Sequence, residues 1–299
     1  MEALTAGTAQ KRRELLEFID RALAPYPAVR AVVGIGSIAA GTARPDSDID
    51  ALVFFDPLDL YIVPAEFIWR PQDGTFHSIF SDVAGVELDL ERLDMALLRD
   101  PQHPWEEGRL QELARGWLAF DRDGEAAQLI AARTAYPESL RVARLDEAIT
   151  WLDQHLAAGV PEARWSNLGP LVAHDRLSAA YGYLVQALFG YNRGWRPWRN
   201  REMTHLLALP WLPERFAERV LAAQVAPEPG EEGYMARVAA LRGLFDDLVT
   251  QVAAAGLYTD DVVGEAFVRS HQEPGRAWNM DAWNAEHRRR SSQEGSPGS

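Results

Sequence analysis

Residues 32–55 read VVGIGSIAAGTARPDSDIDALVFF, and this stretch decides the fold of the first part of the chain. An apolar run leads into a turn of small residues that contains Gly36 and Ser37, and a second apolar run spans Ile49–Phe55. Short apolar runs bounded by glycine, proline and aspartate are typical of buried strands. The pattern therefore predicts a strand over residues 29–34, a Gly-Ser turn with a short helical start, a loop, and a second strand over residues 49–55.

Two aspartates, Asp48 and Asp50, flank Ile49 at the start of the second apolar run. Side chains alternate along a strand, so we expect both carboxylates on the face opposite to Ile49. Two neighbouring carboxylates repel unless a cation lies between them. Mg²⁺ is a hard cation that binds oxygen ligands and substrate phosphates, so these residues predict a magnesium site.

The Gly-Ser turn supplies a complementary site for an anion. Gly36 has no side chain, so the backbone can approach a phosphate closely, and Ser37 offers a hydroxyl group. A helix that starts here would direct its N–H groups at the same phosphate. A phosphate-binding turn beside metal-binding carboxylates is the minimum for phosphoryl or nucleotidyl transfer, which depends on positioning and charge neutralisation.

The same residues resemble the signature of the DNA polymerase beta-type nucleotidyltransferase superfamily: Gly36-Ser37, ten intervening residues, then Asp48-Ile49-Asp50. Within this superfamily, the sequence of the motif is most similar to that of the small bacterial branch of aminoglycoside, lincosamide and minimal nucleotidyltransferases. The alternative is a glycine-rich turn followed by an acidic loop. Such a loop has no reason to place paired aspartates directly against an apolar strand.

The resemblance implies a division of roles in the site. Asp48 and Asp50 would bind two Mg²⁺ ions that bridge the triphosphate of ATP or another NTP. Gly36 and Ser37 would hold the β and γ phosphates. A nucleoside monophosphate would then pass to an acceptor hydroxyl, and pyrophosphate would leave.

A second acidic strand is expected at residues 86–93, which alternate cleanly between apolar and charged residues. The superfamily typically adds a third carboxylate on a neighbouring strand, as a metal ligand or as the general base. Asp89 fits the usual apolar-Asp-apolar context best. Glu87 lies between a valine and a leucine, like the base in some aminoglycoside adenylyltransferases. Both stay candidates for the catalytic carboxylate that acts as the general base, and Asp89 is also the candidate for the third metal ligand. Glu91 is interpreted as a solvated residue of the strand.

Three arginines are candidates for nucleotide binding. Arg44 could contact phosphate or pair with Asp46 within the loop, and the second interpretation is slightly favoured. Residues 189–201 interleave aromatics with four arginines, of which Arg193 and Arg199 could grip the triphosphate or adenine. Alternatively, the tryptophans of this stretch pack on the helices and the arginines extend to solvent. Residues 121–124 (DRDG) are interpreted as a turn rather than as a second metal pair.

Composition restricts the class of protein. The chain has 299 residues, 47% of them hydrophobic, which suffices for two domains with cores. The formal charge of −14 argues against a nucleic-acid partner and suits small or cationic substrates. The absence of cysteine excludes disulfides and thiolate chemistry. The N-terminus lacks an apolar signal core, and no apolar run approaches the length of a membrane span, so a soluble cytoplasmic protein is expected.

The predicted architecture has two domains and a tail. Residues 1–136 form an α/β (α+β) catalytic domain with a mixed sheet, opened by a helix over residues 11–24 that Thr8 would cap. Residues 137–287 form an all-α, bundle-like domain that would bind the acceptor, and residues 288–299 form a disordered tail. The helices predicted in the second domain span residues 138–157, 166–189, 202–208, 214–223, 231–255 and 260–270.

Together these residues predict a magnesium-dependent nucleotidyltransferase that moves an NMP, with AMP favoured, to a hydroxyl acceptor. A small molecule such as an aminoglycoside-like antibiotic is the expected acceptor, and the enzyme would then act in antibiotic resistance. A protein acceptor, as in AMPylating or antitoxin-like transferases, is the first alternative. A non-catalytic nucleotide-binding module is the second, and the intact Gly36, Ser37, Asp48 and Asp50 speak against it.

Overall fold

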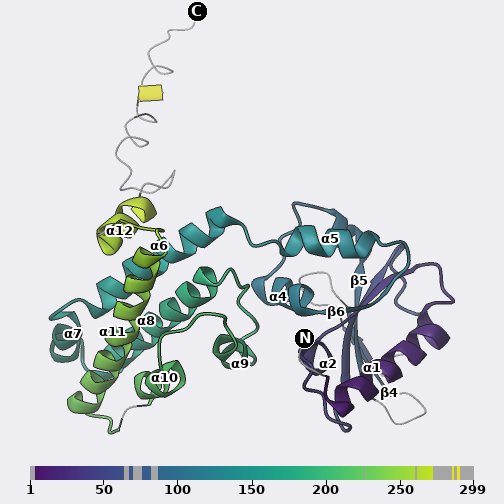
Figure 1. The fold of residues 1–299 in the computed structure, drawn as a ribbon, viewed down its shortest axis with the longest axis horizontal. Helices are drawn as coiled ribbons and strands as arrows, with labels where there is room; N and C mark the ends of the chain where they lie inside the picture. The colour runs from purple at the N-terminus through teal and green to yellow at the C-terminus, as the bar shows by residue number, and fades with distance from the viewer. Residues whose placement is uncertain are drawn as a thin grey trace, which may run out of the picture. The chain divides into compact units, whose positions relative to one another are not determined.

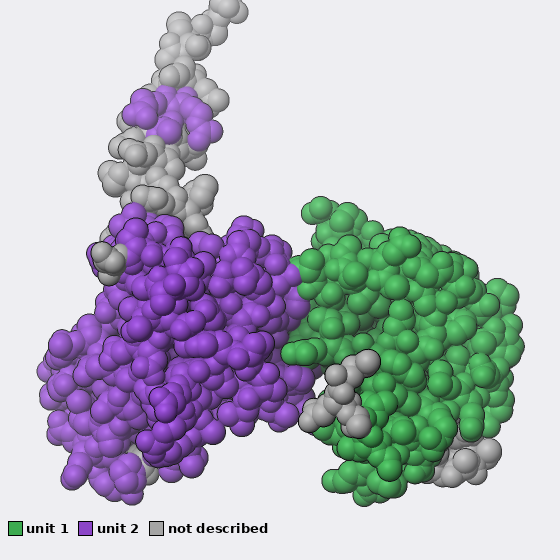
Figure 2. Space-filling view, viewed as in Figure 1, with its two compact units in different colours: residues 1–135 green, residues 136–299 purple. Residues whose placement is uncertain are grey.

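The computed structural model describes residues 4–63, 67–69, 76–81, 87–225, 227–259, 261–271, 285 and 288–289; for residues 67–69, 76–81 and 87 it describes the backbone. The chain divides into two compact units, residues 1–135 and 136–299, which Figure 2 shows in green and purple. The division falls one residue before the predicted domain boundary. Each unit is described by itself below.

A mixed sheet forms the centre of the first unit, as predicted (Figure 1). Its strands lie in the order β3-β4-β5-β2-β1-β6. All neighbouring strands are antiparallel except β2 and β5, which run parallel. The strands are β1 (Val29–Gly34), β2 (Ile49–Phe55), β3 (Phe67–Trp69), β4 (Phe76–Ser81), β5 (Glu87–Asp94) and β6 (Trp117–Asp121).

Helices cover both faces of this sheet. They are α1 (Ala6–Phe18), continued by the π-helical turn η1 (Ile19–Leu23), and α2 (Gly36–Ala40), α3 (Met95–Arg99), α4 (Glu107–Arg115) and α5 (Glu125–Thr134). On one face, Leu15 of α1 packs with Ile49 of β2. On the other face, Leu52 packs with Leu113 of α4 and Ala126 of α5. Because side chains alternate along a strand, Asp50 falls on this second face.

The first helix begins earlier than predicted. Thr5, not Thr8, is its N-cap, and the Thr5 hydroxyl accepts a hydrogen bond from the backbone N–H of Thr8 at 3.1 Å. Thr8 is buried inside the helix, where its hydroxyl accepts a bond from the N–H of Ala43 at 3.0 Å. The predicted cap residue therefore ties the helix to the loop that precedes β2.

The second unit is all-α in the part of the chain that the structure describes, and one buried cluster joins its helices. The predicted helix over residues 166–189 is wrong: it breaks at Gly169, which has a φ of +85°, and a new helix begins at Pro170. The helices are α6 (Glu138–Leu156), α7 (Val160–Leu168), α8 (Pro170–Tyr191), α9 (Glu202–Leu207), α10 (Phe216–Gln224), α11 (Glu231–Ala254) and α12 (Val262–His271).

The helix α12 packs on α6, the first helix of the unit. The guanidinium of Arg269 donates hydrogen bonds to the buried carboxylate of Asp146, the closest at 2.8 Å. The hydroxyl of Tyr258 donates to the same carboxylate at 2.7 Å, and the Arg269 guanidinium lies 4.3 Å from the Tyr258 ring. A buried charge at one end of the unit is thus satisfied by residues from the other end.

The predicted tail, residues 288–299, lies outside the described residues apart from residues 288 and 289. Among the described helices, none combines the length and the apolarity that crossing a bilayer requires.

Candidate active site

The site is built around a close approach between Gly36 and Asp50. Gly36 has a φ of +57°, and a Cβ atom at this position would lie 2.3 Å from Oδ2 of Asp50. The neighbouring backbone is also tied to the strand, because the N–H of Ile35 donates to the carbonyl of Asp50 at 3.0 Å. The glycine is therefore required by the carboxylate itself, as well as by the left-handed backbone.

A second carboxylate lies beside Asp50. In the parallel pair of β2 and β5, Asp50 stands directly opposite Asp89, and register partners of a sheet share a face. Asp48 is exposed and lies in the loop just before β2. Glu87 opens β5 opposite Ser81 of β4, and its side chain is outside the described residues.

Ser37 follows Gly36 at the start of α2. Its hydroxyl oxygen is buried and has no hydrogen-bond partner within the described part of the chain. A buried hydroxyl without a partner is costly, so this group is suited to bind an oxygen atom of a ligand at the turn.

The donor chemistry of these residues fits a divalent metal. Asp50 and Asp89 offer carboxylate oxygens on one face, and Mg²⁺ usually takes one or two carboxylates together with substrate phosphates. The described residues contain no convergent group of three or more His, Asp or Glu side chains. The site thus brings together two of the three predicted metal ligands, Asp50 and Asp89, and leaves Asp48 at its edge.

Arg44 pairs with Asp46 within the loop, which is the interpretation that the sequence slightly favoured. Its Nε donates to Oδ1 of Asp46 at 3.0 Å, and the two side chains are 75% and 74% exposed. This hydrogen bond lowers the pKa of Asp46 below its usual value. The pair is solvated, so it leaves Arg44 able to exchange its partner.

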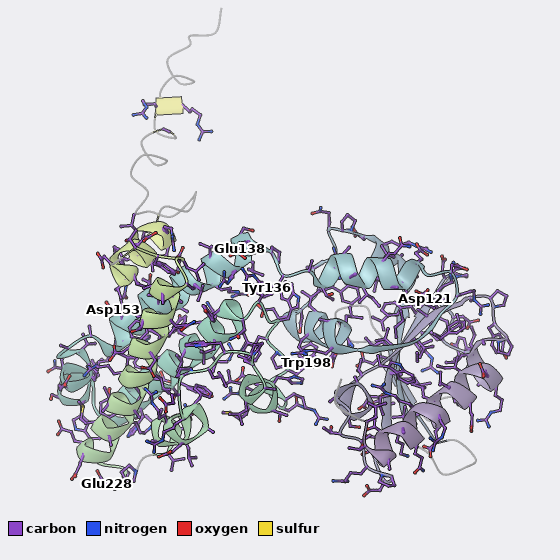
Figure 3. All side chains as sticks on the ribbon, viewed as in Figure 1. Asp121, Tyr136, Glu138, Asp153, Trp198 and Glu228 are labelled. Atoms are coloured by element: carbon purple, nitrogen blue, oxygen red, sulfur yellow. The ribbon has the colours of Figure 1, made fainter. Side chains whose placement is uncertain are left out.

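The other two candidate arginines lie in the second unit, each paired with a glutamate. Arg193 contacts Glu138, the first residue of α6, at 3.0 Å, and Figure 3 labels this glutamate together with Tyr136. Arg199 forms an ion pair with the buried Glu202. The same glutamate also binds Arg196, and the ring of Trp195 packs on Tyr136 with centroids 4.7 Å apart.

The expectation of a solvated Glu91 is wrong. Its side chain is 15% exposed and forms an ion pair with Arg109 of α4, which is 5% exposed. Arg109 also contacts Glu112 at 2.8 Å. Sequence reasoning missed Arg109 because the contact joins β5 to a helix that follows it, and Glu91 fits the alternation of the strand, so no local pattern signals the pair.

The turn interpretation of residues 121–124 is confirmed. The Asp121 carboxylate accepts hydrogen bonds from the N–H groups of Gly124 at 3.1 Å and Ala127 at 2.9 Å. It therefore satisfies the N-terminal end of α5, where Figure 3 labels it.

Comparison with known proteins gives one family and several distant structures. The nucleotidyltransferase domain family matches residues 13–91, a segment that contains Gly36, Ser37, Asp48, Asp50 and Asp89. A search of curated proteins finds no match. The chain is similar to a nucleotidyltransferase-like protein from Exiguobacterium sibiricum, with 12% identity, a TM-score of 0.40, and coverage of 90% of this chain and 81% of that one.

Two further structures are similar at 12% identity. An aminoglycoside 6-adenyltransferase from Bacillus subtilis has a TM-score of 0.34 and coverage of 87% of this chain and 97% of that one. The STING-associated CdnE c-di-GMP synthase from Capnocytophaga granulosa has a TM-score of 0.25 and coverage of 83% of both chains. Likeness at this level establishes no shared substrate. The family match covers residues 13–91, about a quarter of the chain, and together with the site geometry it supports a nucleotidyltransferase domain in the first unit.

Proposed function

We propose that this chain transfers a nucleoside monophosphate, AMP from ATP, to a hydroxyl group of a small-molecule acceptor in a reaction that requires a divalent metal. One observation carries the proposal: the carboxylate of Asp50 lies against the Gly36 turn and opposite Asp89. Metal-binding carboxylates beside a phosphate-binding turn provide the charge neutralisation that this chemistry needs.

Asp50 and Asp89 would hold the metal, and Asp48 would complete the set for a second Mg²⁺. When bound, the ions neutralise the charge of the triphosphate and of the departing pyrophosphate. Gly36 leaves room for the phosphates at the turn, and the buried hydroxyl of Ser37 donates to a β- or γ-phosphate oxygen.

The acceptor hydroxyl must lose a proton as its oxygen attacks the α-phosphorus. Asp89 or Glu87 takes this proton, since the two residues lie two positions apart on β5. The bond between the α-phosphorus and the bridging oxygen then breaks, and pyrophosphate leaves with the electron pair. If Asp89 is occupied as a metal ligand, Glu87 is the base.

Arg44, Arg193 and Arg199 are proposed to contact the nucleotide. Their side chains are 75%, 53% and 77% exposed, although each is paired with a carboxylate. The partners of Arg44 and Arg193 are themselves exposed, and ion pairs between two exposed side chains are weak. A triphosphate can therefore displace the carboxylate from either guanidinium at small cost. The partner of Arg199 is the buried Glu202, which keeps its ion pair with Arg196 if Arg199 turns to the nucleotide.

The second unit is proposed to bind the acceptor. A chain with a formal charge of −14 suits a polycationic acceptor, and aminoglycosides are of this class. Such an enzyme would act in the cytoplasm and inactivate an antibiotic. Modification of a protein side chain is the alternative that the experiment below separates.

The decisive experiment measures pyrophosphate release from ATP, GTP, CTP and UTP with Mg²⁺ against a panel of aminoglycosides and lincosamides. The test variant is Asp50→Ala, and Asp20→Ala is the matched control, since Asp20 is an exposed aspartate of η1 outside the site. We expect release that depends on one acceptor, disappears in Asp50→Ala and persists in Asp20→Ala.

Two other results are informative. Nucleotide binding without release on any panel member would refute the small-molecule acceptor and favour a protein acceptor. Release that persists in Asp50→Ala would overturn the site.

A further inference from the structure

The strand β5 carries a second carboxylate pair with the spacing of the first. Asp48 and Asp50 are separated by one residue, and so are Asp89 and Glu91. Residues at this spacing share one face of a strand and lie about 7 Å apart along it. Glu91 stands opposite Leu52, two positions along β2 from Asp50. By position, therefore, Glu91 belongs to the same acidic face as the proposed metal ligands.

The carboxylate of Glu91 forms an ion pair with an arginine. Arg109 of α4 is 5% exposed and forms ion pairs with Glu91 and with Glu112. The helix α4 covers this face of the sheet through Leu113, which packs with Leu52.

We propose that Arg109 sets the metal preference of the site by withholding Glu91 from it. With Glu91 paired, the face offers a cation the carboxylates of Asp50 and Asp89, a small ligand set that suits Mg²⁺ with substrate phosphates. A third carboxylate on the same face would favour Ca²⁺, which takes 6–8 oxygen ligands in flexible geometry. Arg109 is thus a specificity-determining residue that contacts neither metal nor nucleotide. The inference rests on the proposed function.

The test uses the full chain without nucleotide. Isothermal titration calorimetry measures the affinity for each of two probes, CaCl₂ alone and MgCl₂ alone. In Arg109→Met we expect Ca²⁺ affinity to rise by about tenfold or more, and by more than the affinity for Mg²⁺, because affinity increases with ligand charge. The double variant Arg109→Met/Glu91→Gln is expected to return to the wild-type affinities. Arg109→Lys, which keeps the charge, should behave like the wild type.

Arg99→Met is the matched control. Arg99 forms ion pairs with Asp56 and Glu125, and Asp56 follows the end of β2 that is remote from Asp50. Its substitution removes an arginine and breaks ion pairs in the same unit, yet it should leave the affinity for both metals unchanged.

If the ion pair is merely structural, metal affinity should not rise when it is broken. Breaking it in Arg109→Met would then weaken or leave unchanged the binding of both metals, and either result overturns the proposal. If Arg109→Met does not fold, Arg109→Gln, which keeps a polar side chain beside Glu91 and Glu112, replaces it, with the same expected rise in Ca²⁺ affinity and the same refuting results. A different failure, in which the wild type and Asp50→Ala bind metal and Mg-ATP equally, would reject the proposed function itself.

Discussion

Replacing Gly36 with alanine tests the central contact of the site. The new Cβ would lie 2.3 Å from Oδ2 and 3.2 Å from Cγ of Asp50. An ordinary carbon–oxygen contact is at least about 3.4 Å, so the Asp50 carboxylate must move by roughly 1 Å. Gly36→Ala therefore combines two effects, the left-handed backbone and the displacement of a carboxylate.

A second glycine separates these two effects. Gly41 also has a positive φ, of +78°, but the nearest atom to a Cβ there is Cδ2 of Leu4 at 3.8 Å. The left-handed conformation costs a residue with a Cβ about 1–2 kcal/mol, so we expect Gly41→Ala to lower the free energy of unfolding by that amount. Overpacking adds about 1–3 kcal/mol, which gives a loss of about 2–5 kcal/mol for Gly36→Ala.

The assay is chemical denaturation of both alanine variants, in the wild type and in an Asp50→Ala background. With the carboxylate removed, the loss caused by Gly36→Ala should fall to the loss caused by Gly41→Ala. An equal loss from Gly36→Ala in both backgrounds would refute the reasoning. Because a 1 Å misplacement can cost about 100-fold in rate, Gly36→Ala should also reduce pyrophosphate release by about that factor, and Gly41→Ala should not.

Three further predictions concern stability. Burial and the nearby Arg164 lower the pKa of His155 from its ordinary 6.5 to about 4. The unfolded chain therefore binds the proton more readily than the folded chain does. The free energy of unfolding should fall as the pH drops from 6.5 to 4, by about 3 kcal/mol in total. Denaturation of His155→Asn, which keeps an acceptor for Arg164, should lack this part of the pH dependence. Asp121→Ala removes the acceptor at the start of α5 and should lower the free energy of unfolding by about 1 kcal/mol, whereas Asp121→Asn should lose less. Tyr258→Phe removes a hydrogen bond to the buried Asp146 and should cost about 1.5–3 kcal/mol; an unchanged unfolding midpoint would show that the hydroxyl contributes nothing.

Local patterns predicted the centre of the first unit well. The strands β1 and β2 span the residues that the apolar runs indicated, Val29–Gly34 and Ile49–Phe55. These runs are bounded by turn residues and are buried along nearly their whole length, so their apolar composition matches their place in the core of the sheet. Glycine at position 36 was also singled out, on the grounds of close approach to an anion. The structure adds a reason that the sequence does not contain, since the atom nearest to the missing Cβ belongs to Asp50.

Contacts between distant elements could not be predicted in the same way. The pairing of Glu91 with Arg109 depends on how α4 lies over the sheet, and alternation along β5 alone suggested a solvated residue. The break at Gly169 and Pro170 was a different kind of error. A glycine followed by a proline is a local signal for the end of one helix and the start of another, and the apolar spacing on both sides of it obscured this signal.

The packing of α12 on α6 has a consequence for synthesis of the chain. Asp146 and its cation Arg269 are 123 positions apart, so the helix that carries the acid leaves the ribosome long before its partner exists. Until α12 arrives, burial of Asp146 in the helical core is unfavourable, since an uncompensated charge resists desolvation. The second unit therefore completes its core only after α12 has emerged. A nascent or prematurely terminated product that ends before α12 carries an open apolar seam, the kind of surface that chaperones bind.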